Sequence, residues 1–390
     1  MSSLSPTPQQ PFAGLRVLEC ATVLAGPAVG AFFAELGAEV IKIEPPGGDV
    51  TRHWKLPSED PESSVSAYFS AVNWGKQSVV LDLKSELDTF YELVKGADIV
   101  IANYKPGAAE RLKVDYATLH KLNPRLLYAH LTGYGSQNPR TGYDAIIQAE
   151  SGFLYLNGHP HQPPAKMPVA LMDILAAHQM KEALLIGLWM RERQATAGGG
   201  YYEVSLLESA LVSLVNQATN WLVAGHEPQP MGLEHPNIVP YGSIYTTQDK
   251  QQIMLAVGSD QHFAKLCQLL QIPELAKDPH FQTNTQRVQH RDSLHPHLNK
   301  AIALQQSESL LETLWKLGIP AGKVQPISEA LASPEAQSLI FESLTESMNQ
   351  GTQSPLKGLF HTAFKSPKLR RAALSPPPQL GEHNALFKRL

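Results

Sequence analysis

The sequence predicts an α/β protein in which a large domain with a doubly wound parallel sheet is joined to a smaller α/β domain. Short apolar runs alternate with helical patterns over roughly the first 150 residues, which is typical of a sheet with crossover helices. These runs are almost continuously apolar, as parallel strands must be when helices cover both of their faces. At His226 the composition changes to Pro-, Gly- and polar-rich chain, which indicates a domain boundary.

The first two strands and the helix between them define the pattern. Residues 14–21 form a short buried strand, residues 29–36 a helix that Gly37 ends, and residues 38–44 a second strand. A strand, a helix of about three turns and another strand make a βαβ unit, which implies parallel pairing and a right-handed crossover. The same alternation predicts strands at 77–83, 97–104 and 125–135, and helices at 85–96, 108–112, 116–122 and 143–158.

Residues 168–200 are expected to form one long buried helix with a single carboxylate near its beginning. Apolar side chains recur at helical spacing, and Gly198 to Gly200 end the helix. Asp173 stands just before the apolar run, where an aspartate commonly caps a helix by accepting backbone hydrogen bonds. The other interpretation is functional, because a carboxylate at a rigid helix start beside the Pro- and His-rich loop 158–168 is placed to act on a ligand.

The rest of the chain continues the α/β pattern in a smaller region. We expect a strand-like start and a second long helix over 201–225, a Pro- and Gly-rich linker from 227, a strand at 253–258, a helix at 259–270 capped by Ser259, a helix with a turn and short strand over 308–331, and a short helix after the proline run near the C-terminus.

The composition excludes several classes of protein. The 390 residues are 43% hydrophobic and 17% charged, with a net charge of −4, which does not suggest a nucleic-acid or membrane-surface protein. No apolar run reaches the roughly 18 residues that span a bilayer, and the N-terminus lacks the features of a signal peptide. The two cysteines favour a reducing compartment without a disulfide framework, so we expect a cytoplasmic protein.

Common catalytic and nucleotide motifs are absent. The first turn contains Gly26 and Gly30 but not the G-x-G-x-x-G fingerprint, and Glu44 is weak evidence for a ribose ligand, so an NAD-dependent dehydrogenase is a minor alternative. Neither a phosphate-binding P-loop nor a G-x-S-x-G nucleophile turn occurs. The histidines show no metal-ligand spacing, and no metal is assigned.

Polar side chains follow several of the predicted strands, at the carboxyl edge where open α/β sheets bind ligands. They are Asn103, Tyr104, Lys105 and Arg111 after one strand, Asp82, Leu83, Lys84 and Ser85 after another, and Gly133, Tyr134, Gly135 and Ser136 after a third. The three cations Lys84, Lys105 and Arg111 together have the charge to hold phosphates, and the alternative is a solvated basic rim.

Six segments of the chain, taken in order, resemble the class III CoA-transferases, the CaiB/BaiF-type family. They are GLRVLECATVLAGPAVGAFFAELGAEVIKIEPPGGDVTRHW, NWGKQSVVLDLKS, NYKPGAAERL, LTGYGSQNPRTGYDAIIQAESG, PVALMDILAA and HPNIVPYGSIYTT, and PPPQLGEHN resembles the closing motif of the family. The resemblance covers almost the whole chain.

The resemblance implies that Asp173 is the nucleophile of a CoA transfer. In that chemistry the carboxylate attacks an acyl-CoA thioester, and an acyl-aspartyl anhydride and then an aspartyl-CoA thioester follow. CoA is a co-substrate, and no permanently bound cofactor is expected. The resemblance also implies that Lys105 and Arg111 contact the CoA phosphates, that Asp82 to Ser85 hold the adenine-ribose end, and that Tyr134 and Gly135 lie near the pantetheine.

The resemblance also bears on the substrates and on the alternatives. Leu24 stands where the formyl-CoA enzyme has a glutamine, so formyl-CoA and oxalate are poor guesses, and succinyl-CoA with a dicarboxylate is favoured. The related α-methylacyl-CoA racemases exchange a proton through a histidine, where this chain has Tyr143 followed by Asp144. Tyrosine, with a pKa of about 10, is a poor base at neutral pH, which favours transfer over racemisation. A non-catalytic CoA-binding protein is a further alternative.

The resemblance finally implies a domain plan and an interlocked homodimer, in which the linkers of each chain wrap through the other. The expected divisions are a disordered lead at 1–12, a large CoA-binding domain at 13–225, a linker and small domain at 226–330, and a C-terminal return to the large domain at 331–390.

Overall fold

The computed structural model describes residues 9–194, 198–346 and 355–387. The chain divides into two compact units, the first made of residues up to 153, 167–224 and 337–390, and the second of 154–166 and 225–336. Sequence reasoning placed residues 154–166 in the large domain. In the structure they lie with the second unit, because the Gly232 N–H donates to the Gly158 carbonyl (2.7 Å) and the Tyr155 hydroxyl donates to Gln229 (2.9 Å).

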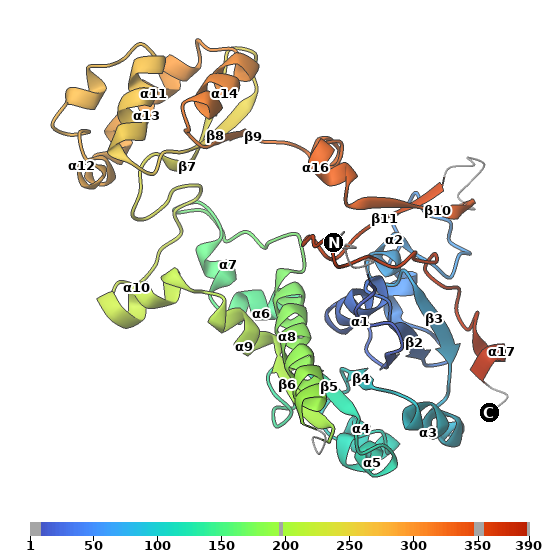
Figure 1. Cartoon of the computed structure of the whole chain (residues 1–390). Helices are drawn as coiled ribbons and strands as arrows, with labels where there is room; N and C mark the ends of the chain where they lie inside the picture. Colours follow the sequence, from blue (N-terminus) through green and yellow to red (C-terminus); the bar gives the residue numbers. More distant parts are fainter. Residues whose placement is uncertain (1–8, 195–197, 347–354, 388–390) are drawn as a thin grey trace, which may run out of the picture. The chain divides into compact units, whose positions relative to one another are not determined.

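A six-stranded parallel sheet organises the first unit, with the order β3-β2-β1-β4-β5-β6 (Figure 1). Its strands are β1 (Arg16–Glu19), β2 (Glu39–Glu44), β3 (Lys76–Val80), β4 (Ile99–Ala102), β5 (Leu127–Thr132) and β6 (Gly200–Ser205). The prediction of a doubly wound sheet is confirmed, although the sheet extends beyond residue 150 to include β6. The strand order reverses between β1 and β4, and ligands bind at such a switch point in open α/β sheets.

Two apolar clusters cover the two faces of this sheet, since neighbouring strand residues point to opposite sides. Val17 and Ile99 belong to the cluster under helices α1 (Ala25–Glu35) and α8 (Leu171–Arg193). Leu18 and Val100 belong to the cluster under helices α3 (Leu87–Lys95) and α5 (Tyr116–Leu122). The helices of this unit are η1 (Val50–His53), α1 (Ala25–Glu35), α2 (Ala67–Ser70), α3 (Leu87–Lys95), α4 (Ala108–Leu112), α5 (Tyr116–Leu122), α6 (Asp144–Glu150), α8 (Leu171–Arg193), α9 (Leu206–Val212), α10 (Asn216–Ala224) and α17 (Asn384–Phe387).

Two of the predicted helices are interrupted. The single helix expected within 201–225 is divided into α9 and α10, because Val215 adopts a left-handed backbone conformation (φ 46°). The helix expected over 143–158 is divided into α6 and α7 (Phe153–Leu156), with Gly152 between them at φ 89°. A left-handed residue cannot continue a right-handed helix, and helical periodicity alone does not reveal it.

The expected disordered lead is only partly testable. Residues 1–8 lie outside the described residues. From residue 9 the chain is ordered: the Gln9 N–H donates to the Lys368 carbonyl (3.0 Å), and the Arg370 N–H donates to the Gln9 carbonyl (2.9 Å). The Phe12 ring packs against the edge of Phe32, 5.6 Å between centroids. Packing of Phe12 on Phe32 and pairing of Gln9 with residues 368–370 therefore order the chain from residue 9.

The C-terminal segment covers the exposed edge of the sheet. It includes the antiparallel pair β10 (Ile340–Glu346) and β11 (Pro355–Leu359) and ends in α17. The His383 N–H donates to the Ser78 carbonyl (3.0 Å), and Asn384 accepts from the Val80 N–H (2.8 Å). These bonds satisfy groups on β3 that an edge strand would otherwise leave unpaired.

The second unit contains a three-stranded antiparallel sheet, β7-β8-β9, and several helices. The strands are β7 (Tyr241–Thr246), β8 (Gln252–Ala256) and β9 (Ala321–Lys323), and the helices are α11 (Asp260–Leu269), η2 (Leu275–Lys277), α12 (Asn284–Gln289), α13 (Arg291–Ile302), α14 (Ser307–Lys316) and α15 (Ile327–Leu331), followed by α16 (Pro334–Gln337). The Ser259 cap is confirmed, since its hydroxyl accepts from the His262 N–H (3.1 Å). No helix in the described ranges is long and apolar enough to cross a membrane.

Candidate active site

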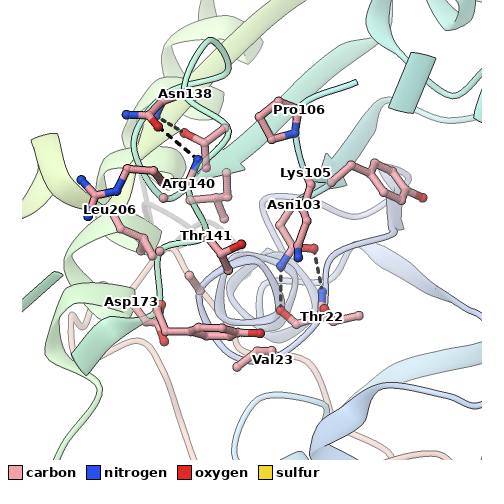
Figure 2. Close-up of a pocket in the computed structure, with 18 of the residues that line it drawn as sticks. Thr22, Val23, Asn103, Lys105, Pro106, Asn138, Arg140, Thr141, Asp173 and Leu206 are labelled. Atoms are coloured by element: carbon pink, nitrogen blue, oxygen red, sulfur yellow. Dashed lines mark hydrogen bonds between the residues drawn. The ribbon is translucent and has the colours of Figure 1, made fainter. Parts of the chain in front are cut away.

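A cavity of about 220 Å³ opens at the switch point of the sheet (Figure 2). The turns after β1 and β4 are tied together there, because the Thr22 N–H donates to the Asn103 side chain (3.2 Å), whose amide donates back to the Thr22 carbonyl (3.0 Å). The cavity is lined by Thr22, Val23, Leu24, Ala25, Asn103, Tyr104, Lys105, Pro106, Leu131, Thr132, Gly133, Gly135, Asn138, Arg140, Thr141, Gly142, Tyr143, Asp173 and Leu206.

Asp173 lies in the first turn of α8 and is the one carboxylate among these lining residues. Its interpretation as the helix cap is wrong, because the cap position is Ala170 and no side chain of that residue caps the helix. Asp144 performs that task from α6, since one carboxylate oxygen accepts from the Met172 N–H (2.8 Å) and the other accepts from the Gln148 amide (2.7 Å). Asp173 therefore does not cap α8.

Burial and charge both act on the Asp173 carboxyl group. Asp173 is 9% exposed, and no donor in the described part of the chain hydrogen-bonds its carboxylate. Burial and, to a smaller extent, the negative charge of Asp144 together raise its pKa from 3.8 to about 7. A large fraction of the group is therefore ionised at neutral pH without being neutralised by a cation, which is the state a carboxylate nucleophile needs.

The turn between β1 and α1 forms the wall of the cavity together with Asp173. Helix α1 begins at Ala25 with Leu24 at the cap position, and within the described residues no side chain accepts from the backbone N–H groups of its first turn. These N–H groups and the positive end of the helix dipole favour a negative charge nearby. Gly26 is needed here because a Cβ at that position would lie 2.3 Å from the Ala21 side chain.

The structure brings together only some of the predicted binding residues. Asn103, Tyr104, Lys105 and Gly135 line the cavity. The others lie outside its lining: Asp82, Leu83, Lys84 and Ser85 follow β3 at the edge of the sheet, Arg111 is in the last turn of α4, and Tyr134 packs against the apolar core with the Arg140 guanidinium 4.3 Å from its ring centre.

A buried histidine connects the two loops that flank the cavity. The His130 ring contacts the Tyr104 carbonyl (2.9 Å) through one nitrogen and the Tyr201 hydroxyl (2.9 Å) through the other. The Tyr201 hydroxyl donates to Glu203 (3.1 Å), which also accepts from the Ser136 N–H (2.5 Å). The chain of bonds therefore fixes the loop that carries Lys105 relative to the loop that carries Gly135.

Sequence reasoning missed two segments of the cavity wall. Residues 22–25 follow the first strand, but the sequence was compared there only with the dinucleotide fingerprint and, at Leu24, with the formyl-CoA enzyme, and none of the four residues was predicted to bind substrate. Residues 138–143 follow the fifth strand, and of these only Tyr143 was discussed, as the counterpart of a racemase histidine. The signal for both was their place at the carboxyl end of a predicted parallel strand. No group of three metal-binding side chains occurs in the described ranges.

The chain is similar to known proteins over nearly its full length. It is 35% identical to the succinate–glutarate CoA-transferase of Agrobacterium fabrum, over 97% of this chain and 95% of that one. It is 34% identical to the acetyl-CoA:oxalate CoA-transferase of Acetobacter aceti, over 100% and 98% of the two chains. The crystal structure of a CaiB/BaiF family protein from Brucella suis superposes with a TM-score of 0.85 at 35% identity, covering 99% of both chains.

A family model agrees with these similarities. The model described as CoA-transferase family III matches residues 12–384, which include every element of the parallel sheet and the carboxylate of the cavity. The resemblance seen in the sequence motifs is thereby confirmed. The chain belongs to CoA-transferase family III and is an enzyme of that family.

Proposed function

We propose that this enzyme transfers CoA from an acyl-CoA to a free carboxylic acid and that Asp173 is the covalent nucleophile. The observation that carries the proposal is the Asp173 carboxylate itself, buried in the switch-point cavity without a hydrogen-bond donor in the described chain. A carboxylate held for structural reasons is normally paired, and a buried unpaired one is costly. A carboxylate that acts as a nucleophile must be accessible from the cavity and free of such pairing, and Asp173 meets both conditions.

The proposed reaction proceeds through two enzyme-bound species. A carboxylate oxygen of Asp173 attacks the thioester carbon, the C–S bond breaks, and a mixed anhydride and CoA thiolate form. The thiolate attacks the aspartyl carbon, giving an aspartyl-CoA thioester and releasing the donor acid. The acceptor carboxylate then attacks that thioester, and the released thiolate attacks the new acyl carbon, which restores Asp173. No bond energy is lost to water, so no nucleotide is consumed.

The residues around the cavity suit each part of this sequence. The first-turn N–H groups of α1, at Leu24 and Ala25, provide donors for the oxygen that becomes negative when the carbonyl is attacked. Lys105 supplies a positive charge at the mouth for the CoA phosphates, and Arg111 lies at the end of the helix that follows. Asp82 to Ser85, Asn103, Tyr104, Tyr134 and Gly135 remain proposed CoA contacts.

The α-methylacyl-CoA racemase alternative is disfavoured because neither Tyr143 nor Asp144, at the place of the racemase histidine, is suited to be the second acid–base group. Tyr143 lines the cavity but is 59% exposed, and Asp144 is committed to Met172 and Gln148. Incubation of an α-methylacyl-CoA with the enzyme in deuterated water separates the two reactions. Transfer without deuterium uptake is expected, and rapid exchange of the α-proton would favour the racemase.

We propose succinyl-CoA as donor and a dicarboxylic acid as acceptor. The support is the similarity to the enzyme named for succinate and glutarate. The similar enzyme named for acetyl-CoA and oxalate makes that pair the competing choice, although Leu24 argues against oxalate. Both names include a dicarboxylic acid. The decisive measurement is a panel of acyl-CoA donors against free acids, read by mass spectrometry, with succinyl-CoA and glutarate as the first pair.

A homodimer is proposed as the functional assembly. Helices α8, α9 and α10 carry large apolar side chains that the single chain leaves exposed: Ile186, Trp189, Val212, Trp221, Leu222 and Val223. Exposed apolar surface of this extent marks an interaction site, and interlocked chains would cover it. The mass in solution, measured by light scattering, is expected to be twice 42.7 kDa. The cytoplasmic localisation stays a prediction.

Trapping of the intermediate tests the nucleophile. The enzyme is incubated with succinyl-CoA, treated with hydroxylamine and digested, and the peptide that contains Asp173 is expected to carry a hydroxamate. Asp173→Asn keeps the size of the side chain and removes the nucleophile, so it should bind CoA, lose transfer and remain unmodified. Turnover by the purified Asp173→Asn enzyme would refute the assignment.

A further inference from the structure

One backbone conformation at the cavity is unusual. Val23 has φ 74°, in the left-handed region, where a β-branched residue is a genuine outlier because its side chain clashes with the backbone. Val23 lines the cavity and lies directly before the cap position of α1. A conformation that the residue itself disfavours must be imposed by its surroundings, and such residues concentrate at functional sites.

The Asp49 carboxylate contacts the backbone of Val23 directly. The Val23 N–H points at both oxygens of this carboxylate, at 3.3 and 3.2 Å. Asp49 is fully buried and is the cap of the short helix η1, where it accepts from the Thr51 N–H (3.0 Å) and the Thr51 hydroxyl (2.8 Å). Asp49 cannot follow Val23 if the turn relaxes, because the Thr51 backbone N–H and the Lys42 ammonium hold the carboxylate in place.

A buried ion cluster fixes Asp49 further. The Lys42 ammonium lies 3.0 Å from Asp49 and 3.0 Å from Glu19, and Lys76 lies 2.7 Å from the other oxygen of Glu19. All four side chains are buried and their formal charges cancel. Moving one member would leave an uncompensated charge in the interior, which is strongly unfavourable. The cluster is therefore a rigid support behind the turn.

Asn103 holds the same turn through its two hydrogen bonds with Thr22. With Thr22 and Val23 both fixed, the direction in which α1 starts is fixed as well. Of the N–H groups at the start of α1 that precede the first helical hydrogen bond, those of Leu24 and Ala25 belong to residues that line the cavity, as Asp173 does. The geometry of these donors thus depends on the conformation of Val23.

We propose that Asp49 is a positioning residue for CoA transfer: it holds Val23 in the left-handed conformation that directs the first turn of α1 at Asp173. This inference rests on the proposed function. It predicts an effect on kcat rather than on KM, because the donors act on the oxygen that becomes charged during attack, whereas the CoA phosphates are bound elsewhere.

The test is a rescue experiment on the full-length enzyme with succinyl-CoA and glutarate. Asp49→Ala removes both acceptors of the Val23 N–H, and kcat is expected to fall at least about tenfold while the KM for succinyl-CoA changes by less than about twofold. Glycine adopts left-handed φ values readily. Adding Val23→Gly to Asp49→Ala should therefore restore kcat to within about threefold of Val23→Gly alone. A double variant as slow as Asp49→Ala would overturn the proposal.

A matched control separates positioning from general loss of stability. Thr51→Val removes one hydrogen bond to the same carboxylate without touching Val23, so its kcat should stay within about twofold of wild type. Equal losses in Thr51→Val and Asp49→Ala would overturn the proposal. If Asp49→Ala does not fold, Asp49→Asn is used, which keeps the volume of the side chain and should show a smaller loss with the same rescue.

Hydrogen exchange gives a readout that does not depend on turnover. In the wild-type enzyme the amide of Val23 should be protected, and in Asp49→Ala the peptide over residues 22–28 should exchange faster. Unchanged exchange there would refute the role of Asp49. Wild-type enzyme that transfers no CoA from any donor in the panel would instead refute the proposed function, so the two failures are distinguishable.

Discussion

The raised pKa of Asp173 makes a quantitative prediction about the pH dependence of transfer. Only the ionised carboxylate attacks the thioester, so kcat/KM should rise with pH and reach half its plateau near pH 7 in the free enzyme. Burial is the larger cause of the raised pKa, and the charge of Asp144 is the second. Removing that charge should lower the pKa of Asp173, whereas burial should keep it above 3.8.

The perturbation is Asp144→Asn. The amide oxygen can still accept from the Met172 N–H, but its NH₂ group faces the Gln148 amide, which loses an acceptor. Loss of one buried acceptor costs about 1–3 kcal/mol of stability, which the fold should tolerate. A neighbouring like charge shifts a pKa by about one unit, so at pH 6 the ionised fraction of Asp173 should rise from about a tenth to about a half.

The assay is kcat/KM for succinyl-CoA between pH 5 and 9, measured for wild type and Asp144→Asn with the same acceptor. The substrates titrate identically with both enzymes, so their own ionisations cancel in the ratio. At pH 6, kcat/KM divided by its high-pH plateau should be about fivefold larger for Asp144→Asn than for wild type. Above pH 8 this ratio should be the same for the two enzymes.

A control keeps the charge and removes the hydrogen bond. Gln148→Met leaves the Asp144 carboxylate in place and should keep half-maximal activity near pH 7. The electrostatic reasoning is refuted if the Asp144→Asn profile coincides with that of wild type, or if its acidic limb moves to higher pH.

Three further predictions follow from the same contacts. At pH 8 the free energy of unfolding of Asp173→Asn should exceed that of wild type by about 4 kcal/mol, because folding raises the pKa of Asp173 from 3.8 to about 7 and ionisation of the carboxyl group therefore opposes folding. This difference should shrink as the pH falls from 7 and vanish below about pH 4. Denaturant unfolding of both proteins across this pH range measures it. Lys105→Ala should raise the KM for acyl-CoA severalfold, and less at high ionic strength because salt already screens the charge; an unchanged KM would place Lys105 outside the CoA site. Tyr201→Phe removes the hydroxyl that joins His130 to Glu203, so the Kd for CoA, measured by calorimetry, should rise severalfold. Tyr116→Phe changes a neighbouring ring that lacks those hydrogen bonds, and its Kd for CoA should equal that of wild type.

Much of the fold follows from the sequence because its strands are almost uniformly apolar. A strand such as Ile99–Ala102, buried on both faces, leaves few alternatives to a parallel sheet covered by helices. The sequence did not show that β6 joins the sheet after the long helix α8, since strand order depends on packing rather than on local pattern. The interruption at Val215 was also hidden, because no residue preference predicts a left-handed valine.

The candidate site was predictable in part and for two different reasons. Motif resemblance indicated Asp173, whereas position alone favoured the helix cap, and the structure gives that task to Asp144 from another helix. The residues at strand ends that border the switch point, Asn103 to Lys105, line the cavity. Asp82 to Ser85 follow an edge strand, so the same rule placed them correctly at the carboxyl edge of the sheet but not in the cavity.

The residues that sequence reasoning missed are those whose role is set by a distant partner. Val23 is an ordinary valine in the sequence, and Asp49 follows a Pro- and Gly-rich turn that resembles a surface loop. Only the fold shows that a fully buried aspartate, fixed by Lys42, holds a disfavoured backbone conformation beside Asp173. The unpaired carboxylate and the left-handed valine both reduce stability, and both border the same cavity. Two unfavourable features that border one cavity, of which the valine is held by hydrogen bonds to a buried aspartate, are best explained by a shared chemical task.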